Sequence, residues 1–146
     1  MVRREPPAAA QASREFMEYD VTEWPYVRAF VKPVYPNEEQ FQAHLDCFSE
    51  LLRGGELFTI SFNLEQAKLP AMDLLKKLAA FMNDHRPHIQ ANLAASTVVT
   101  TSMLVHGALK VLFSLKTPVK PQKSFDTDAE AKRWLAIHYA AAARNT

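Results

Sequence analysis

The order of the hydrophobic patterns in the second half of the chain constrains the fold more than any other feature of the sequence. Residues 94–101 form an apolar run ending in β-branched residues, which is typical of a buried strand. Residues 103–115 form an apolar segment of helical length, and Ser102 stands where it can cap that helix. This part of the chain therefore predicts a buried strand followed directly by a helix.

A second strand and helix follow after a connection that contains Pro118 and Pro121. The short strand is expected around residues 124–125. Thr127 can cap the last helix, which starts at about residue 128, and Glu130 is its capping-box partner. The order strand, helix, strand, helix predicts crossover connections between parallel strands.

The first half of the chain predicts a hairpin after an irregular leader. Residues 1–17 show no periodicity and contain a Pro-Pro pair and an alanine tract, so we expect a disordered leader, with the folded domain spanning residues 18–146. Residues 19–24 can extend, and residues 26–32 alternate apolar with polar side chains, which is typical of a half-buried strand. Pro25 separates the two runs, so they are expected to pair as a hairpin.

Two helices and one more strand are expected between the hairpin and residue 94. Asn37 and Gln40 have the spacing of a capping box at the start of the first helix, which ends near Gly54. Residues 57–62 read as a central strand, and a second helix covers residues 71–83. The fold class is therefore α/β, with one mostly parallel or mixed sheet of about five strands and about four helices.

Length, charge and cysteine content exclude several functions. A chain of 146 residues suits one domain, and a formal net charge of +1 gives no global support for nucleic-acid binding. Cys47 is the single cysteine, so no internal disulfide is expected, and residues 1–15 lack the apolar core of a secretory signal. No apolar run reaches the roughly 20 residues that a membrane-spanning helix needs. These features predict a cytoplasmic protein without a transmembrane segment.

From residue 18 to its end the sequence resembles the STAS-like domains related to the anti-sigma-factor antagonist SpoIIAA, including the bacterial "STAS/SEC14" proteins. The residues that carry the resemblance are Phe81-Met82-Asn83-Asp84-His85, Leu104-Val105-His106-Gly107-Ala108-Leu109, Phe113, Ser124-Phe125-Asp126-Thr127 and Glu130-Ala131-Lys132-Arg133-Trp134-Leu135. The resemblance implies a SpoIIAA-like fold and a regulatory or protein-interaction role.

The regulatory serine of this family has no counterpart in the chain. In anti-sigma antagonists a serine opens the helix after the third strand, and its phosphorylation controls partner binding. The matching residues here are Lys68-Leu69-Pro70-Ala71-Met72, which include no hydroxyl group. The resemblance therefore does not imply a phosphorylation switch.

Residues that could support chemistry are few. His44 and Cys47 stand one helical turn apart and could form a thiolate–imidazole pair, but the pattern favours a buried, inert cysteine. Asp84, His85 and His88 cluster near Pro87 without the spacing of a familiar metal site. We expect no enzyme activity, no resident cofactor and no metal.

Phosphate binding has one weak candidate site. The three glycines form no glycine-rich phosphate loop, but Thr100, Thr101 and Ser102 precede a helix whose N-terminus could hold an anion. The alternative is simple capping by Ser102. Gly107 lies inside that helix, where a glycine predicts the close approach of a neighbour, through packing on the sheet or contact with a ligand.

A cationic, acid-free stretch is the strongest functional pointer. No Asp or Glu occurs between residues 89 and 125, whereas four lysines do. Together with the apolar helix at residues 103–115, this stretch could dock on an acidic protein, an anionic lipid surface or a second copy of the chain. The candidate interaction surface consists of His106, Lys110, Phe113, Lys116, Lys120 and Lys123.

The sequence is compatible with three classes of function. The first is a non-enzymatic regulatory or interaction module, acting as a homodimer or with an unidentified protein partner. The second is a carrier of small apolar ligands or lipids. The third is an enzyme that uses His44 and Cys47.

Overall fold

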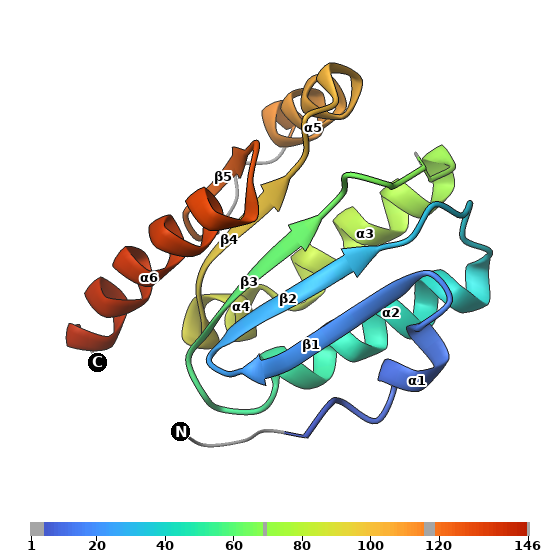
Figure 1. Cartoon of the computed structure of the whole chain (residues 1–146). Helices are drawn as coiled ribbons and strands as arrows, with labels where there is room; N and C mark the ends of the chain where they lie inside the picture. The colour runs from blue at the N-terminus through green and yellow to red at the C-terminus, as the bar shows by residue number, and fades with distance from the viewer. Residues whose placement is uncertain (1–4, 69, 116–118, 146) are drawn as a thin grey trace.

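The computed structural model describes residues 5–68, 70–115 and 119–145, with the side chains of residues 111–115 left aside. Its core is one five-stranded sheet in the order β1-β2-β3-β4-β5, in which β1 runs antiparallel to β2 and the other neighbours are parallel (Figure 1). The strands are β1 (Met17–Glu23), β2 (Tyr26–Val31), β3 (Phe58–Asn63), β4 (Leu93–Val99) and β5 (Gln122–Phe125). The helices are α1 (Ala10–Ser13), α2 (Glu38–Leu52), α3 (Met72–Asp84), α4 (Arg86–Asn92), α5 (Met103–Leu115) and α6 (Asp128–Arg144).

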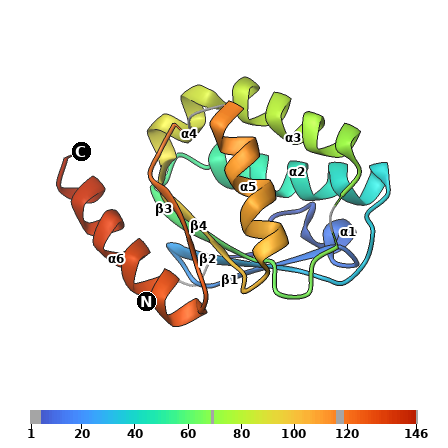
Figure 2. The ribbon, with the colours of Figure 1, turned by 90° about the horizontal axis from the view of Figure 1, so that it is seen from above.

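The helices are divided unequally between the two faces of the sheet. Figure 2 shows α2, α3, α4 and α5 on one side and α6 alone on the other. Helix α5 follows the carboxyl end of β4 and is seen nearly end-on in Figure 1, beyond the end of the sheet rather than flat on its face. The expected α/β class, the five strands and their mixed pairing are confirmed.

Local sequence signals placed the N-terminal half correctly. β1 and β2 form the expected hairpin around Pro25. The capping box of α2 is complete, because the Asn37 side chain accepts from the Gln40 N–H at 2.8 Å and the Gln40 side chain accepts from the Asn37 N–H at 3.0 Å. The α2 stripe that faces the sheet is buried and includes Phe41, Leu45, Phe48 and Leu52.

The leader differs from expectation, because its last part packs against α2. Ser13 and Phe16 are buried, and α1 lies beside α2 in Figure 1. The Glu50 carboxylate accepts from the backbone N–H groups of Ala8 and Ala9, at 2.8 and 3.3 Å. Phe16 and the Glu50 carboxylate, which is 41 residues from Ala9 in the chain, hold this segment, so local periodicity did not reveal it.

The helix count also differs, because Pro87 begins a helix instead of only ending one. α3 stops at Asp84, and Pro87 stands in the first turn of α4, where its missing N–H has no helical partner to lose. Helix α4 then leads directly into β4. With α1 and α4 included, the described residues contain six helices where about four were expected.

A histidine lies within the aromatic core. His44 is buried among Phe16, Phe41 and Phe62, and its Nδ1 lies 2.7 Å from the hydroxyl oxygen of Tyr19. Burial lowers the pKa of His44 from its ordinary 6.5 to about 3. The folded protein therefore holds this imidazole neutral throughout the mildly acidic range.

Acid should weaken the fold through this histidine. Between pH 6.5 and about 3 the unfolded chain binds a proton at His44 that the folded chain does not bind. The free energy of unfolding should therefore fall with decreasing pH, with His44 contributing up to about 1.4 kcal/mol per pH unit. Urea unfolding at a series of pH values should show a shallower slope in His44→Gln than in the wild type. His88→Gln, which changes a histidine outside the core, serves as the control, and an equal effect of both variants would contradict the assignment.

Candidate interaction surface

Helix α5 exposes an apolar face. Among residues 103–110 no side chain is buried, and Met103 and Leu104 are 82% and 72% exposed. Gly107 and Lys110 are also exposed, whereas the side chains on the opposite side are half-buried. Exposed positions at 103, 104, 107 and 110 recur with helical spacing and lie along one side of the helix. We call Met103, Leu104, Gly107 and Lys110 the α5 face.

Polar contacts attach the first turns of α5 to the end of the sheet. The His106 ring donates from Nε2 to the backbone oxygen of Thr100 at 2.9 Å, and the same atom lies 3.9 Å from Asp126. The Ser102 hydroxyl accepts from the Val105 N–H at 3.3 Å, so the expected cap is confirmed. These contacts fix α5 by its half-buried side and leave the α5 face free of them.

The three hydroxyls proposed for an anion are already engaged. Thr100 accepts from the Ser102 N–H at 3.1 Å, and Ser102 caps α5. Thr101 donates to the Glu65 carboxylate at 3.0 Å. With the carboxylates of Glu65 and Asp126 beside it, the start of α5 is an acidic place, and its geometry does not support an anion site.

The expected cationic surface does not gather on one face of the described residues. Of its members, Lys110 belongs to the α5 face, whereas His106 points to Thr100 on the inner side. Lys123 lies over the Phe125 ring at 5.3 Å, and Phe125 contacts Trp134 of α6, so Lys123 lies on the α6 side of the sheet. The Phe113 side chain and Lys116 lie outside the described residues.

Lys120 belongs to a separate hollow near the C-terminus of α6. This open groove has a volume of about 350 Å³ and is lined by Leu57, Gln90, Ala91, Ala94, Lys120, Pro121, His138, Ala141, Ala142 and Asn145. A second hollow of about 350 Å³ lies between α1 and the start of α2. Neither groove is lined by residues of α5.

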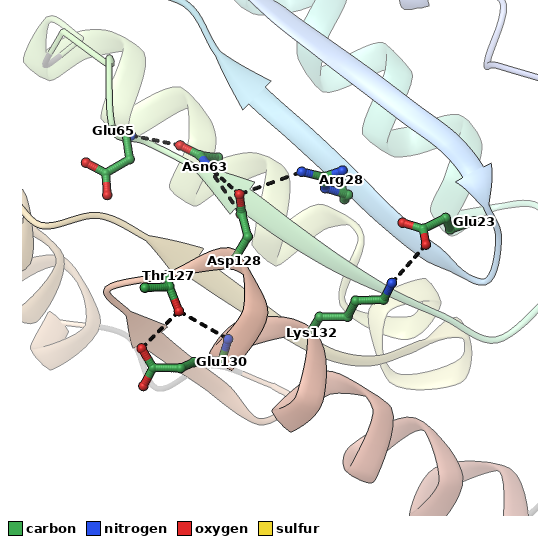
Figure 3. Close-up of polar contacts among 8 residues, drawn as sticks. All are labelled: Glu23, Arg28, Asn63, Glu65, Thr127, Asp128, Glu130 and Lys132. Carbon is green, nitrogen blue, oxygen red and sulfur yellow. Dashed lines mark hydrogen bonds and ion pairs between the residues drawn. The ribbon is translucent and has the colours of Figure 1, made fainter.

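Helix α6 is attached to the opposite face of the sheet by contacts that no local pattern indicates (Figure 3). Asp128 in its first turn lies 3.6 Å from the Arg28 guanidinium and accepts from the Asn63 amide at 3.2 Å. Lys132 pairs with Glu23 at 2.8 Å. The partners are 65 to 109 residues apart in the chain, so only the tertiary structure reveals them.

Figure 3 also shows the cap of α6. The Thr127 hydroxyl accepts from the Glu130 N–H at 3.2 Å and donates to the Glu130 carboxylate at 3.0 Å. The expected N-cap is thus confirmed, but the capping box is not formed, because the Glu130 carboxylate accepts from the Thr127 hydroxyl rather than from the Thr127 backbone N–H. Ala131 and Leu135 then pack on the sheet, and Trp134 is half-buried against Phe125.

His44 and Cys47 do not form a reactive pair. The imidazole is committed to Tyr19, and Cys47 is fully buried. Burial, with added repulsion from Glu50 and Asp46, raises the pKa of the Cys47 thiol to about 12. A thiol in this state is neither ionised near neutral pH nor reachable by a substrate.

The cluster at the end of α3 is a packing contact in the described residues. The His85 ring stacks on Phe81 with 4.0 Å between centroids, and its Nε2 lies 3.0 Å from the Ser49 hydroxyl. Within the part of the chain that the structure describes, no three His, Cys, Asp or Glu side chains are grouped to hold a metal ion. In the same part, no helix is both long and apolar enough to cross a membrane.

The start of α3 has no side-chain cap. Ala71 occupies the N-cap position, where a methyl group can neither accept from the backbone nor be phosphorylated. It lies within residues 68–72, the region that the resemblance matches to the serine of anti-sigma antagonists. Leu69, one of the residues in this region, lies outside the described residues.

The fold is that of a SpoIIAA-like domain. The chain is similar to the crystal structure of an uncharacterised protein of the DUF3478 family with a SpoIIAA-like fold, from Shewanella loihica PV-4. The TM-score is 0.61 at 11% sequence identity, and the match covers 82% of this chain and 91% of that chain. No family model and no curated protein matches the sequence. At this identity the likeness establishes the fold alone, and it confirms the architecture that the sequence resemblance implied.

The burial of Cys47 gives a direct test of the catalytic alternative. Iodoacetamide should label Cys47 in urea but not in the native protein, because alkylation requires an accessible thiolate. Mass spectrometry of the intact chain measures the modification. An Ile137→Cys variant, with its new thiol at a position that is 68% exposed, is the control and should gain one label under native conditions. Rapid native labelling of Cys47 itself would restore the enzyme hypothesis.

Proposed function

We propose that the chain is a non-enzymatic regulatory or interaction module of SpoIIAA-like fold that binds a protein through the α5 face. The observation that carries this proposal is an apolar helix with no buried side chain among residues 103–110. Exposed apolar side chains gathered on one helix are typical of a surface that a partner covers. The proposed module acts in the cytoplasm, in keeping with a single, buried cysteine.

The charges around the α5 face favour a protein over a nucleic acid. Lys110 is the cation of this face, and Glu65 and Asp126 stand at the N-terminal end of the helix. A phosphate backbone requires a clustered cationic surface, and these carboxylates oppose it. A protein surface can match one basic and one acidic end with complementary charges.

Two features limit the mechanism of regulation. The N-cap of α3 is Ala71, so the module is proposed to work without the serine phosphorylation of anti-sigma antagonists. His44 and Cys47 support the fold from inside the core. Binding is therefore proposed to depend on the shape and charge of the α5 face rather than on a covalent change.

Replacing Leu104 should abolish binding without unfolding the protein. Leu104→Glu places a charge at the centre of the apolar face, where a partner would have to bury it, so partner capture should fall by about tenfold or more. Ile137→Glu is a matched control on α6, with a similarly exposed apolar side chain. Affinity capture with quantitative mass spectrometry should find proteins retained by the wild type and Ile137→Glu but lost from Leu104→Glu. Equal capture by all three baits would contradict the proposal, and circular dichroism checks their folding.

Lipid binding is the alternative, favoured by the combination of Met103, Leu104 and Lys110 on one face. Such a face can insert apolar side chains into a membrane surface while a lysine contacts anionic head groups. The carboxylates of Glu65 and Asp126 oppose this arrangement. The two hollows among the described residues are open grooves, which fits a peripheral contact better than a lipid carrier.

Vesicle sedimentation separates the two candidates. With vesicles of phosphatidylcholine and phosphatidylserine, we expect the wild-type protein to stay in the supernatant at physiological ionic strength. Sedimentation that depends on phosphatidylserine and is lost in Leu104→Glu would favour the lipid alternative. Native mass spectrometry of freshly purified protein should show the mass of the chain without a retained lipid.

A further inference from the structure

We infer that the α5 face binds the α5 face of a second copy of this chain, with the two helices antiparallel about a two-fold axis near Gly107. The inference rests on the function proposed above, because it names the partner of the same face. It is drawn from three features of α5, which are a helix-interior glycine, the spacing of its exposed side chains and the charges at its two ends.

In the part of the chain that the structure describes, nothing around Gly107 requires a glycine. A glycine inside a helix weakens that helix relative to alanine, and Gly107 does not have the positive φ that would require a glycine. Among the described residues, a Cβ atom added at this position would meet nothing within 4 Å. That part of the chain therefore does not supply the expected neighbour. A missing side chain on the exposed side of a helix lets a second backbone approach from outside.

The exposed side chains on either side of Gly107 suit a helix–helix contact. Met103 and Leu104 lie one turn before the glycine, and Lys110 lies about one turn after it. Two antiparallel helices that cross at Gly107 would place Lys110 of one copy opposite Leu104 of the other. The lysine stem can cover the leucine while its ammonium group remains near the rim. Each copy thus supplies both the apolar and the basic half of the contact.

The charges select the antiparallel arrangement. The N-terminal end of α5 carries the carboxylates of Glu65 and Asp126, and Lys110 lies about 10 Å further along the helix. In an antiparallel pair the lysine of each copy approaches the acidic end of the other, whereas a parallel pair would bring like charges together. A two-fold axis uses the same patch on both copies, so one acidic and one basic end suffice.

A cysteine at the proposed axis provides the test. In an isologous contact a residue on the axis meets its own copy, and a disulfide forms when the two Cα atoms lie within about 7 Å. Gly107→Cys should therefore give a disulfide-linked dimer under mild oxidation in most of the protein, and Ile137→Cys, at an exposed position of α6, should remain monomeric. Cys47 is buried and should not interfere. Non-reducing gel electrophoresis and light scattering after size exclusion measure the products.

Charge exchange provides a second, reversible measurement. Lys110→Glu should weaken dimerisation of the unmodified chain by about tenfold or more, and adding Asp126→Lys to it should restore the dimer. A monomer at high concentration, or a dimer that Gly107→Cys fails to link, would overturn the α5–α5 pairing. If such a monomer still captured proteins or vesicles through Leu104, the α5 face would remain an interaction site and only its pairing with a second copy would be rejected.

Discussion

The structure depends on the need to cover both faces of a parallel sheet. Parallel strands are joined by crossovers and are stable only when helices bury them on both sides. Here α2, α3 and α4 lie on one side and α6 on the other, and every residue of β4 is buried. None of residues 103–110 of α5 is buried, so this apolar helix is left with an uncovered face.

The contact between the sheet and α6 is more polar than the contact between the sheet and the helices on its opposite face. The hydroxyls of Ser61 and Thr97 are paired in register on β3 and β4, on the face that carries Arg28, and both are buried. The Thr97 hydroxyl has no hydrogen-bond partner among the described residues. Ion pairs and hydrogen bonds at the start of α6 and the packing of Leu135 hold this helix in place. The opposite face contains the aromatic core around His44. A polar lining under α6 weakens the hydrophobic contribution on that side, so its charged contacts at the helix start matter more.

The reactive groups considered as chemical candidates are buried or already hydrogen-bonded. The one cysteine and its neighbouring histidine are buried, and the hydroxyls at the start of α5 are engaged in capping or bonded to a carboxylate. Outside the core, α5 exposes apolar side chains beside an acidic start and a basic middle. In the proposed contact, burial of apolar area would provide affinity and the charges would provide orientation.

The sequence by itself determined the features that depend on near neighbours. Asn37 with Gln40 and Thr127 with Glu130 marked helix starts, and the alternation of apolar runs indicated the hairpin and the parallel strands. Only the tertiary structure decided which apolar segments are covered, since periodicity reports that a side chain is apolar but not whether another helix already occupies its place. For the same reason the packing of α1 through Glu50, the pairing of Asp128 with Arg28, and the open space beside Gly107 carried no local signal.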